Sequence, residues 1–433
     1  MKEGYKKTEL GEIPNEWNIV KTDEILINDK SSIKIGPFGS QLKKEFLIEQ
    51  GYKVYGQENV FKNDFTLGNR YINKERYEIL KSSELKSGDL VISMMGTVGK
   101  TAIVPEDIEI GIMDSHLIRL RVDESKYSKE LLRQMIQNSP LIKKQIKKLS
   151  VGGIMEGLSS TIIKQLKFPL INLKEQEKIA EILSTVDGQI DDTEMLIEKC
   201  QELKKGLMQR LLTKGIGHTE FKKTEVGEIP VEWEVVPFES LYEEKIRDFG
   251  SFSTTKLIEY VEEGVPYLRS ENFRENKLNY ETVNKITKKV DELLNKSYVY
   301  IDNILFTKIG NIGAAYCYKG ELGERCNSNA TIAKIKLNRE KVVNEYIVYF
   351  LISDICKKQY AGDIVSTPPR INMGVISKFR VTVPPIEEQE KISQILISLD
   401  KEIEDYKNKK QKLEELKKGL MQQLLTGKLR TIM

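Results

Sequence analysis

Leu203-Lys-Lys-Gly-Leu-Met-Gln-Arg-Leu-Leu-Thr213 returns near the end of the chain as Leu416-Lys-Lys-Gly-Leu-Met-Gln-Gln-Leu-Leu-Thr426, with identity at 10 of 11 positions. A second pair, Glu175-Gln-Glu-Lys-Ile179 and Glu388-Gln-Glu-Lys-Ile392, matches at every position. Between these landmarks, apolar residues recur at alternating intervals of three and four, which is typical of a helix with one buried seam. Each half of the chain is therefore predicted to contain one copy of the same long helix.

The segments ahead of the helices are repeated too. Lys7-Thr-Glu-Leu-Gly-Glu-Ile-Pro-Asn-Glu-Trp17 returns as Lys223-Thr-Glu-Val-Gly-Glu-Ile-Pro-Val-Glu-Trp233, identical at 9 of 11 positions. The period is close to half the chain, far longer than the unit of a solenoid. Two copies of one domain-plus-helix module make a pseudo-symmetric molecule, and such a chain is suited to a target that also has two parts.

The spacing inside the two helices is conserved. From Gln176 to Gly206 is 30 positions, and from Gln389 to Gly419 is also 30. A helix of roughly 40 residues is on the order of 60 Å long, and each inserted residue would add ~1.5 Å and rotate the chain. A fixed length indicates that the helices set a distance.

The apolar seams predict that the two helices pack on each other, antiparallel, as a rod with a globular domain at each end. The alternative is that each helix docks only on its own domain. The residues assigned to the seam and to docking of partners are Ile179, Leu183, Val186, Ile190, Ile197, Leu207 and Leu211 in the first helix, and Ile392, Leu396, Leu399, Ile403, Leu413, Leu420 and Leu424 in the second.

The globular parts contain short β-rich runs, such as Leu90–Ser93 and Ile304–Phe306, broken by glycine, asparagine and aspartate. This pattern predicts small sheets with helices beside them, hence an α+β fold with two pseudo-symmetric domains separated by two long helices in an antiparallel coiled coil. The predicted segments are a first domain at 1–172, a first helix at 173–214, a second domain at 215–385 and a second helix at 386–433.

Bulk properties fit a multidomain globular protein. The chain has 433 residues, of which 39% are hydrophobic and 31% charged, and its net charge is only +3. It has no apolar run long enough to cross a bilayer, and four cysteines without metal-ligand spacing. These features predict a cytoplasmic protein with reduced thiols, and they leave nucleic-acid binding open, because a local basic patch can hide in a balanced total.

The sequence shows no convincing active site. Met94-Met-Gly-Thr-Val-Gly-Lys-Thr101 approaches a phosphate-binding loop but has methionine where that motif needs its first glycine. The corresponding Lys308–Ala315 keeps two glycines without the lysine, so a turn or a DNA-facing loop is expected rather than a nucleotide site. The only histidines, His116 and His218, have no nucleophile or second ligand at a suitable spacing. No catalytic, cofactor-binding or metal-binding residue is predicted.

The doubled entry motif, the doubled helix start and the doubled helix end together resemble the specificity subunit of a type I restriction–modification system. The resemblance extends over essentially the whole chain. It implies two target-recognition domains that read a bipartite double-stranded DNA site, and two helices that fix the gap and hold two adenine methyltransferase subunits. It also implies that restriction and translocase subunits join the complex, and that S-adenosylmethionine, ATP and Mg²⁺ are bound by these partners and not by this chain. This chain would then be non-catalytic.

Loops that differ between the two repeats are where specificity is expected, because scaffold segments repeat and specificity loops diverge. Polar and basic side chains in these loops can contact base edges or phosphates. The candidates are Ser40, Gln41, Lys43, Lys44, Gln57, Asn59, Thr97, Lys100 and His116 in the first domain, and Lys256, Arg269, Ser270, Asn272, Lys308, Asn311, Asn329, Arg370 and Asn372 in the second.

Two other functions are compatible with parts of the pattern. A coiled-coil scaffold, or a DNA-binding protein without a restriction–modification role, would also need long apolar seams. A nucleotide hydrolase would use the Lys100 loop and would lose ATP binding on Lys100→Ala substitution.

Overall fold

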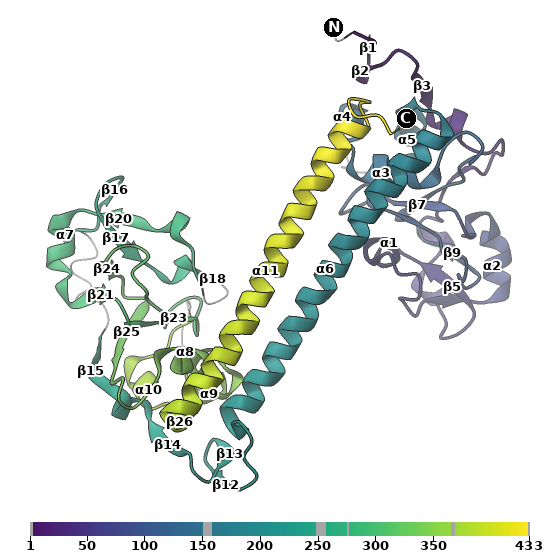
Figure 1. Cartoon of the computed structure of the whole chain (residues 1–433). Helices are drawn as coiled ribbons and strands as arrows, with labels where there is room; N and C mark the ends of the chain where they lie inside the picture. Colours follow the sequence, from purple (N-terminus) through teal and green to yellow (C-terminus); the bar gives the residue numbers. More distant parts are fainter. Residues whose placement is uncertain (1–2, 150–157, 248–256, 275–276, 365–368, 432–433) are drawn as a thin grey trace. The chain divides into compact units, whose positions relative to one another are not determined.

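A computed structural model of the chain describes residues 3–149, 158–247, 257–274, 277–364 and 369–431. The chain divides into two compact units: the first combines residues 1–194 with 408–433, and the second spans 195–407. Each unit therefore contains the globular part of one repeat and segments of both long helices, α6 (Leu173–Lys214) and α11 (Ile386–Leu424). The repeated α+β architecture predicted from the sequence is confirmed (Figure 1).

The first unit has a four-stranded sheet in the order β4-β10-β7-β8 and a three-stranded sheet in the order β6-β5-β9. Strand β7 is buried at all its positions, with Leu90 and Ile92 in one apolar cluster and Val91 in another. Alternate residues of a strand point to opposite faces, so the sheet is covered on both sides. The elements are β1 (Tyr5–Thr8), β2 (Gly11–Pro14), β3 (Asn18–Lys21), β4 (Ile33–Ile35), β5 (Tyr52–Tyr55), α1 (Gln57–Lys62), β6 (Tyr71–Ile72), α2 (Lys74–Leu80), β7 (Leu90–Ser93), β8 (Thr101–Ile103), β9 (Gly111–Met113), β10 (Leu117–Leu120), α3 (Lys129–Asn138), α4 (Pro140–Leu149), α5 (Ser160–Gln165) and β11 (Lys167–Leu170).

The second unit repeats this plan with a sheet in the order β15-β25-β22-β23 and a five-stranded sheet in the order β16-β20-β17-β24-β21. Strand β22 is again buried throughout, with Ile304 and Phe306 in one cluster and Leu305 in the other. The elements are β12 (Phe221–Thr224), β13 (Gly227–Pro230), β14 (Glu234–Pro237), β15 (Tyr242–Arg247), β16 (Tyr260–Val261), β17 (Val265–Leu268), β18 (Phe273–Arg274), β19 (Lys277–Leu278), β20 (Asn284–Ile286), α7 (Lys288–Leu293), β21 (Tyr298–Tyr300), β22 (Ile304–Thr307), β23 (Ala315–Cys317), β24 (Arg325–Ser328), β25 (Ile332–Leu337), α8 (Asn344–Ile352), α9 (Asp354–Tyr360), α10 (Met373–Ser377) and β26 (Arg380–Val383).

The repeated entry motif forms the same hairpin in each unit. Strands β1 and β2 turn at Gly11, and β12 and β13 turn at Gly227, with φ of 101° and 112°. A side chain at such a φ would be strained, which explains why glycine is repeated there. The tryptophan that ends each motif, Trp17 or Trp233, is buried in the core of its unit.

Helices α6 and α11 pack on each other in opposite chain directions (Figure 1). In the first unit Asp187 of α6 meets Lys417 of α11, and further along Glu194 meets Lys410. Residue numbers rise on one helix as they fall on the other, so the predicted antiparallel pairing is confirmed.

The helices also dock on the domains, so the two packing arrangements considered from the sequence occur together. Leu183 of α6 and Leu424 of α11 belong to the core of the first unit. Leu211 of α6 and Leu396 of α11 belong to the core of the second. Among the fourteen predicted seam residues, Ile190, Leu207, Leu413 and Leu420 are half-buried and the other ten are buried.

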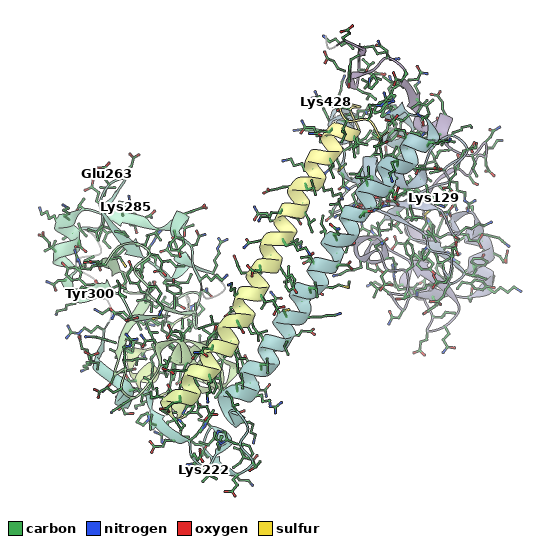
Figure 2. The ribbon with its side chains drawn as sticks, in the orientation of Figure 1. Lys129, Lys222, Glu263, Lys285, Tyr300 and Lys428 are labelled. Carbon is green, nitrogen blue, oxygen red and sulfur yellow. The ribbon has the colours of Figure 1, made fainter. Side chains whose placement is uncertain are left out.

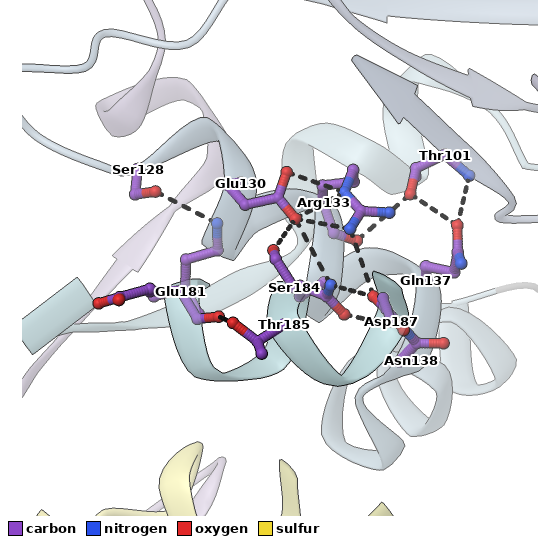
Figure 3. Close-up of polar contacts among 12 residues, drawn as sticks. Thr101, Ser128, Glu130, Arg133, Gln137, Asn138, Glu181, Ser184, Thr185 and Asp187 are labelled. Atoms are coloured by element: carbon purple, nitrogen blue, oxygen red, sulfur yellow. Dashed lines mark hydrogen bonds and ion pairs between the residues drawn. The ribbon is translucent and has the colours of Figure 1, made fainter. Parts of the chain in front are cut away.

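In the first unit a single aspartate joins the recognition domain to both helices. The Asp187 carboxylate of α6 accepts hydrogen bonds from two side chains of α3, Arg133 at 3.4 Å and Gln134 (Figure 3 shows the α3 contacts). It also forms an ion pair with Lys417 of α11. The side chains of Asp187, Arg133 and Lys417 are only 20%, 17% and 14% exposed. Glu130 forms a second ion pair with the Arg133 guanidinium at 2.6 Å, and this contact fixes the position of the arginine side chain.

The second unit has the corresponding joint. Asp400 of α11 accepts a hydrogen bond from the Tyr349 hydroxyl of α8 at 2.7 Å and pairs with Lys204 of α6 at 2.5 Å. Asp400 lies 12 positions beyond Glu388, as Asp187 lies 12 beyond Glu175, so the two aspartates occupy equivalent places in the repeat. Lys204 and Lys417 lie in the apolar seam, and each forms an ion pair with an aspartate across to the other helix.

The end of α11 is fastened to the first unit. Arg430, two residues beyond Lys428 of Figure 2, donates to Glu175 at 2.7 Å and also pairs with Glu16. The Glu175 side chain is fully buried, so the arginine neutralises a carboxylate that has no access to water. The Tyr5 hydroxyl donates to the Gly427 carbonyl at 2.7 Å and ties the same segment a second time.

In the second unit the segment after α6 is fastened in the same manner with different residues. Glu388 accepts from the Trp233 indole at 2.9 Å, contacts His218 Nε2 at 2.9 Å and accepts the Ile216 amide at 2.8 Å. His218, one of the two histidines, thus has a structural position between the end of one helix and the start of the other.

Candidate nucleic-acid interface

The loop between β7 and β8 in the first unit is a tight turn fixed by one hydroxyl. Ser93 donates to the Thr97 carbonyl at 2.6 Å and accepts the Lys100 amide at 3.1 Å. Gly96 and Gly99 have φ of 65° and 81°, which the glycines tolerate without strain. Thr97 is exposed at the tip. The two hydrogen bonds of Ser93 therefore fix the base of the loop.

The loop between β22 and β23 in the second unit has the same backbone. Thr307 donates to the Asn311 carbonyl at 2.5 Å and accepts the Ala314 amide at 2.9 Å. The glycines at 310 and 313 have φ of 78° and 93°. Asn311 is exposed where the first unit has Thr97.

This geometry does not fit a phosphate-binding loop. In that motif the lysine opens a helix whose N-terminus faces the phosphates. Here Lys100 is followed directly by strand β8. The loop is the turn expected from its two glycines.

A second pair of turns lies next to the first. In the first unit the Asp114 carboxylate accepts the His116 amide at 3.0 Å and contacts the imidazole Nδ1 at 3.2 Å. In the second unit the Asn329 side chain accepts the Thr331 amide at 3.0 Å and the Thr331 hydroxyl at 2.5 Å. Thr331 therefore occupies the place of His116. Thr331 was not among the predicted DNA contacts, although the strand-like run that it begins is the counterpart of the run that begins at His116. The two turns share this hydrogen-bond pattern but no residue type.

Asn59 and Asn272, both predicted to contact DNA, are 1% and 0% exposed. Asn59 accepts the Gly56 amide at 2.9 Å, and Asn272 accepts the Arg269 amide at 2.7 Å. Their amide nitrogens donate to backbone oxygens inside the same unit. The structure removes both from the candidate interface, because their hydrogen-bonding groups are already used to hold a loop.

The other candidates fall into three groups. Lys308 is 8% exposed, so its side chain has little surface to offer, and Lys256 lies outside the described residues. The remaining side chains are exposed or half-buried: Ser40, Gln41, Lys43, Lys44, Gln57, Thr97, Lys100, His116, Arg269, Ser270, Asn311, Asn329, Arg370 and Asn372.

Only some of these side chains are brought together. Gln57 donates to the Met95 carbonyl, so it lies beside the turn that carries Thr97. Arg370 forms a β-bridge with Ile309 and thereby adjoins the corresponding turn of the second unit. The Ser40 backbone instead accepts from Arg76 of α2, 3.2 Å away, and belongs to another part of the first unit.

Two cysteine thiols of the second unit have pKa values that are raised by burial. Burial raises the pKa of Cys317 to about 11 and the pKa of Cys326 to about 12. Both groups are therefore protonated near neutral pH, and a protonated thiol is a poor nucleophile.

Among the residues that the structure describes, no group of histidines, cysteines and carboxylates could hold a metal ion. No described helix is long and apolar enough to span a membrane.

The two-domain architecture with its paired helices corresponds to a known family. The family model for the type I restriction modification DNA specificity domain matches this chain twice, over residues 14–202 and 230–415. The chain belongs to this family, and with two such domains it is a specificity subunit of a type I restriction–modification system.

Two of the relatives match almost the full length of this chain, and a third matches 70% of it. The putative type I restriction enzyme MjaX specificity subunit of Methanocaldococcus jannaschii is 32% identical, over 99% of this chain and 97% of the relative. The MjaVIII specificity subunit of the same organism is 26% identical over 99% and 96%. The EcoBI specificity subunit of Escherichia coli is 22% identical over 70% of this chain and 65% of its own length.

Solved structures share the fold at low identity. The S subunit of a type I restriction–modification system from M. genitalium has a TM-score of 0.56 at 16% identity, and covers 94% of this chain and 96% of its own. A chain from a study of complex assembly in a type I R-M system has a TM-score of 0.54 at 15% identity, with coverage of 96% and 99%.

Proposed function

We propose that each recognition domain reads one half of an asymmetric, bipartite double-stranded DNA site, and that the paired helices fix the gap between the halves. The observation that carries this proposal is the presence of two specificity domains of one fold whose exposed loop residues differ. A repeated frame with different side chains selects two different sequences. Arg and Lys at the loop surface would add contacts to phosphates.

The helices would carry two methyltransferase subunits. Leu203 and Leu416 occupy equivalent places in the repeated helix ends and are 52% and 51% exposed. An exposed leucine in the same sequence context on each helix gives two similar surfaces, which suits two copies of one partner. Restriction and translocase subunits would complete the assembly. S-adenosylmethionine, ATP and Mg²⁺ would be bound by those partners, and this chain would catalyse no step itself.

The test is to co-express the chain with its methyltransferase partner and to map methylated adenines across the genome by single-molecule sequencing. We expect a two-part motif with a fixed gap and different halves, absent when this chain is omitted. If a soluble, associated complex yields no motif, the chain is a scaffold and the proposal is wrong.

A further inference from the structure

Three loop positions in each unit share one backbone frame and differ in side chain. The first is the tip of the β7–β8 or β22–β23 turn, where Thr97 corresponds to Asn311. The second is the turn where His116 corresponds to Thr331. The third position follows the end of β5 or β17. There the backbone amide of Gly56 or Arg269 donates a hydrogen bond to the side chain of a buried asparagine three residues later in the chain.

At this third place Gln57 of the first unit corresponds to Ser270 of the second, because each directly follows the residue whose amide is held. Both side chains are half-buried rather than enclosed. The buried Asn59 and Asn272, removed above as DNA contacts, therefore fix the positions from which Gln57 and Ser270 emerge.

The three places converge in the first unit. Gln57 donates to the Met95 carbonyl at 2.5 Å, so the position after β5 lies beside the β7–β8 turn. The Met94 amide donates to the His116 carbonyl at 2.8 Å, which joins the turn to the His116 position. The His116 side chain is 48% exposed, and its Nδ1 faces Asp114, so Nε2 is the nitrogen left for an external partner.

The three places also converge in the second unit. The Ser270 amide donates to the Thr331 hydroxyl at 3.0 Å. The Lys308 amide donates to the Thr331 carbonyl at 2.8 Å, as Met94 does to His116. The Asn311 side chain reaches back to the Phe273 carbonyl at 3.4 Å, next to the Ser270 loop.

We propose that these three places are equivalent base-reading positions and that the side chains on them determine the difference between the two half-sites. The reading residues are Gln57, Thr97 and His116 in the first unit, and Ser270, Asn311 and Thr331 in the second. This inference rests on the proposed DNA-reading function and names the residues that carry it.

The chemistry of the two sets predicts where the half-sites diverge. Glutamine and asparagine amides pair with the N6 and N7 edge of adenine. Thr97 offers a hydroxyl and a methyl group, whereas the Thr331 hydroxyl already donates to Asn329 and accepts the Ser270 amide, so Thr331 offers its methyl group and one remaining acceptor lone pair. In the first unit the amide side chain belongs to Gln57, at the position that follows β5. In the second unit it belongs to Asn311, at the tip of the β22–β23 turn. One N–H of Gln57 is engaged with Met95, and the second N–H and the carbonyl oxygen remain for a base. The two halves should therefore place an adenine contact at different steps.

The experiment transplants the first set onto the second unit. The full-length triple variant Ser270→Gln, Asn311→Thr and Thr331→His is co-expressed with the methyltransferase, and methylated adenines are mapped. We expect the second half of the motif to change at one or more bases toward the first half, with a shift in base preference of about tenfold or more. The first half and the gap should stay as in the wild-type complex.

The matched control is Ser240→Gln, because Ser240 is an exposed serine of the same unit, in the 3-10 turn Phe238–Leu241 and outside the three loop positions; its motif should be unchanged. An unchanged second half in an active triple variant overturns the inference. If the triple variant is inactive, the single variant Asn311→Thr decides: an altered or relaxed second half supports the inference, and the wild-type motif overturns it. Failure of the proposed function itself is distinguishable, because the wild-type complex would then give no bipartite motif.

Discussion

Asp187 is a position at which a single substitution is expected to destabilise the first unit measurably. It accepts from Gln134, faces Arg133 and pairs with Lys417, and all three partners are largely buried. Its change to alanine removes the carboxylate that pairs directly with Lys417, while Arg133 keeps Glu130 and Lys417 keeps the longer-range attraction of Asp191.

The magnitude follows from these contacts. Breaking a fully buried ion pair by removing one partner costs about 3–5 kcal/mol, and hydrogen bonds to charged groups contribute about 1.5–3 kcal/mol. The side chains are 14% to 20% exposed and Arg133 is compensated, so we expect Asp187→Ala to lower the free energy of unfolding of the first unit by about 2–3 kcal/mol. In a double-mutant cycle, Lys417→Met should show a coupling to Asp187→Ala of about 1–2 kcal/mol.

The assay is urea unfolding combined with amide hydrogen exchange, which reports the two units separately. The control is Asp192→Ala, because Asp192 is an exposed aspartate on the same helix and gains the same helix propensity. Protection should fall in the first unit and stay unchanged in the second. If Asp187→Ala costs no more than Asp192→Ala, or if the coupling to Lys417 is near zero, the assignment of this joint is refuted.

Three further outcomes are expected. Arg430→Ala should expose the C-terminal segment to limited proteolysis and destabilise the first unit by about 2–3 kcal/mol, because it leaves the buried Glu175 carboxylate unpaired; an unchanged cleavage pattern would contradict this. Glu388→Ala should weaken protection around the end of α6 by removing the acceptor of the Trp233 indole, and hydrogen exchange equal to wild type would count against that role. In the native protein a maleimide at neutral pH should label Cys200 before Cys317, Cys326 and Cys356, because Cys200 is half-buried whereas the other three thiols are buried, and mass spectrometry of peptides would detect any other order.

The helices were largely predictable from sequence because periodicity and exact repetition are both visible in a single chain. The seam positions, the antiparallel pairing and the doubled domain follow from these patterns. The ion pairs at Asp187 and Asp400 were not predictable, because a lysine at a seam position does not reveal which residue of another helix will face it.

The loop residues were predicted with less success for a physical reason. Asn59 and Asn272 have the same residue type as an asparagine that reads a base, and only their burial in the structure distinguishes them from an exposed one. His116 and Thr331 begin corresponding strand-like runs, but the residue type of Thr331 does not mark it as a candidate until the hydrogen bonds of the two turns are compared. Side-chain type suggests what a residue can bind, and the turn geometry decides whether it is presented.

The fastening of the chain's end into the first unit has a consequence for synthesis on the ribosome. The apolar core of that unit includes Met421, Leu424 and Leu425, which are translated after the second unit. The second unit, at 195–407, is complete in sequence before them. At roughly 5–20 residues per second, the first recognition domain waits for tens of seconds without part of its core. The first unit is thus completed after the second, and a chain that stops before Met421 contains the whole second unit and an incomplete core of the first.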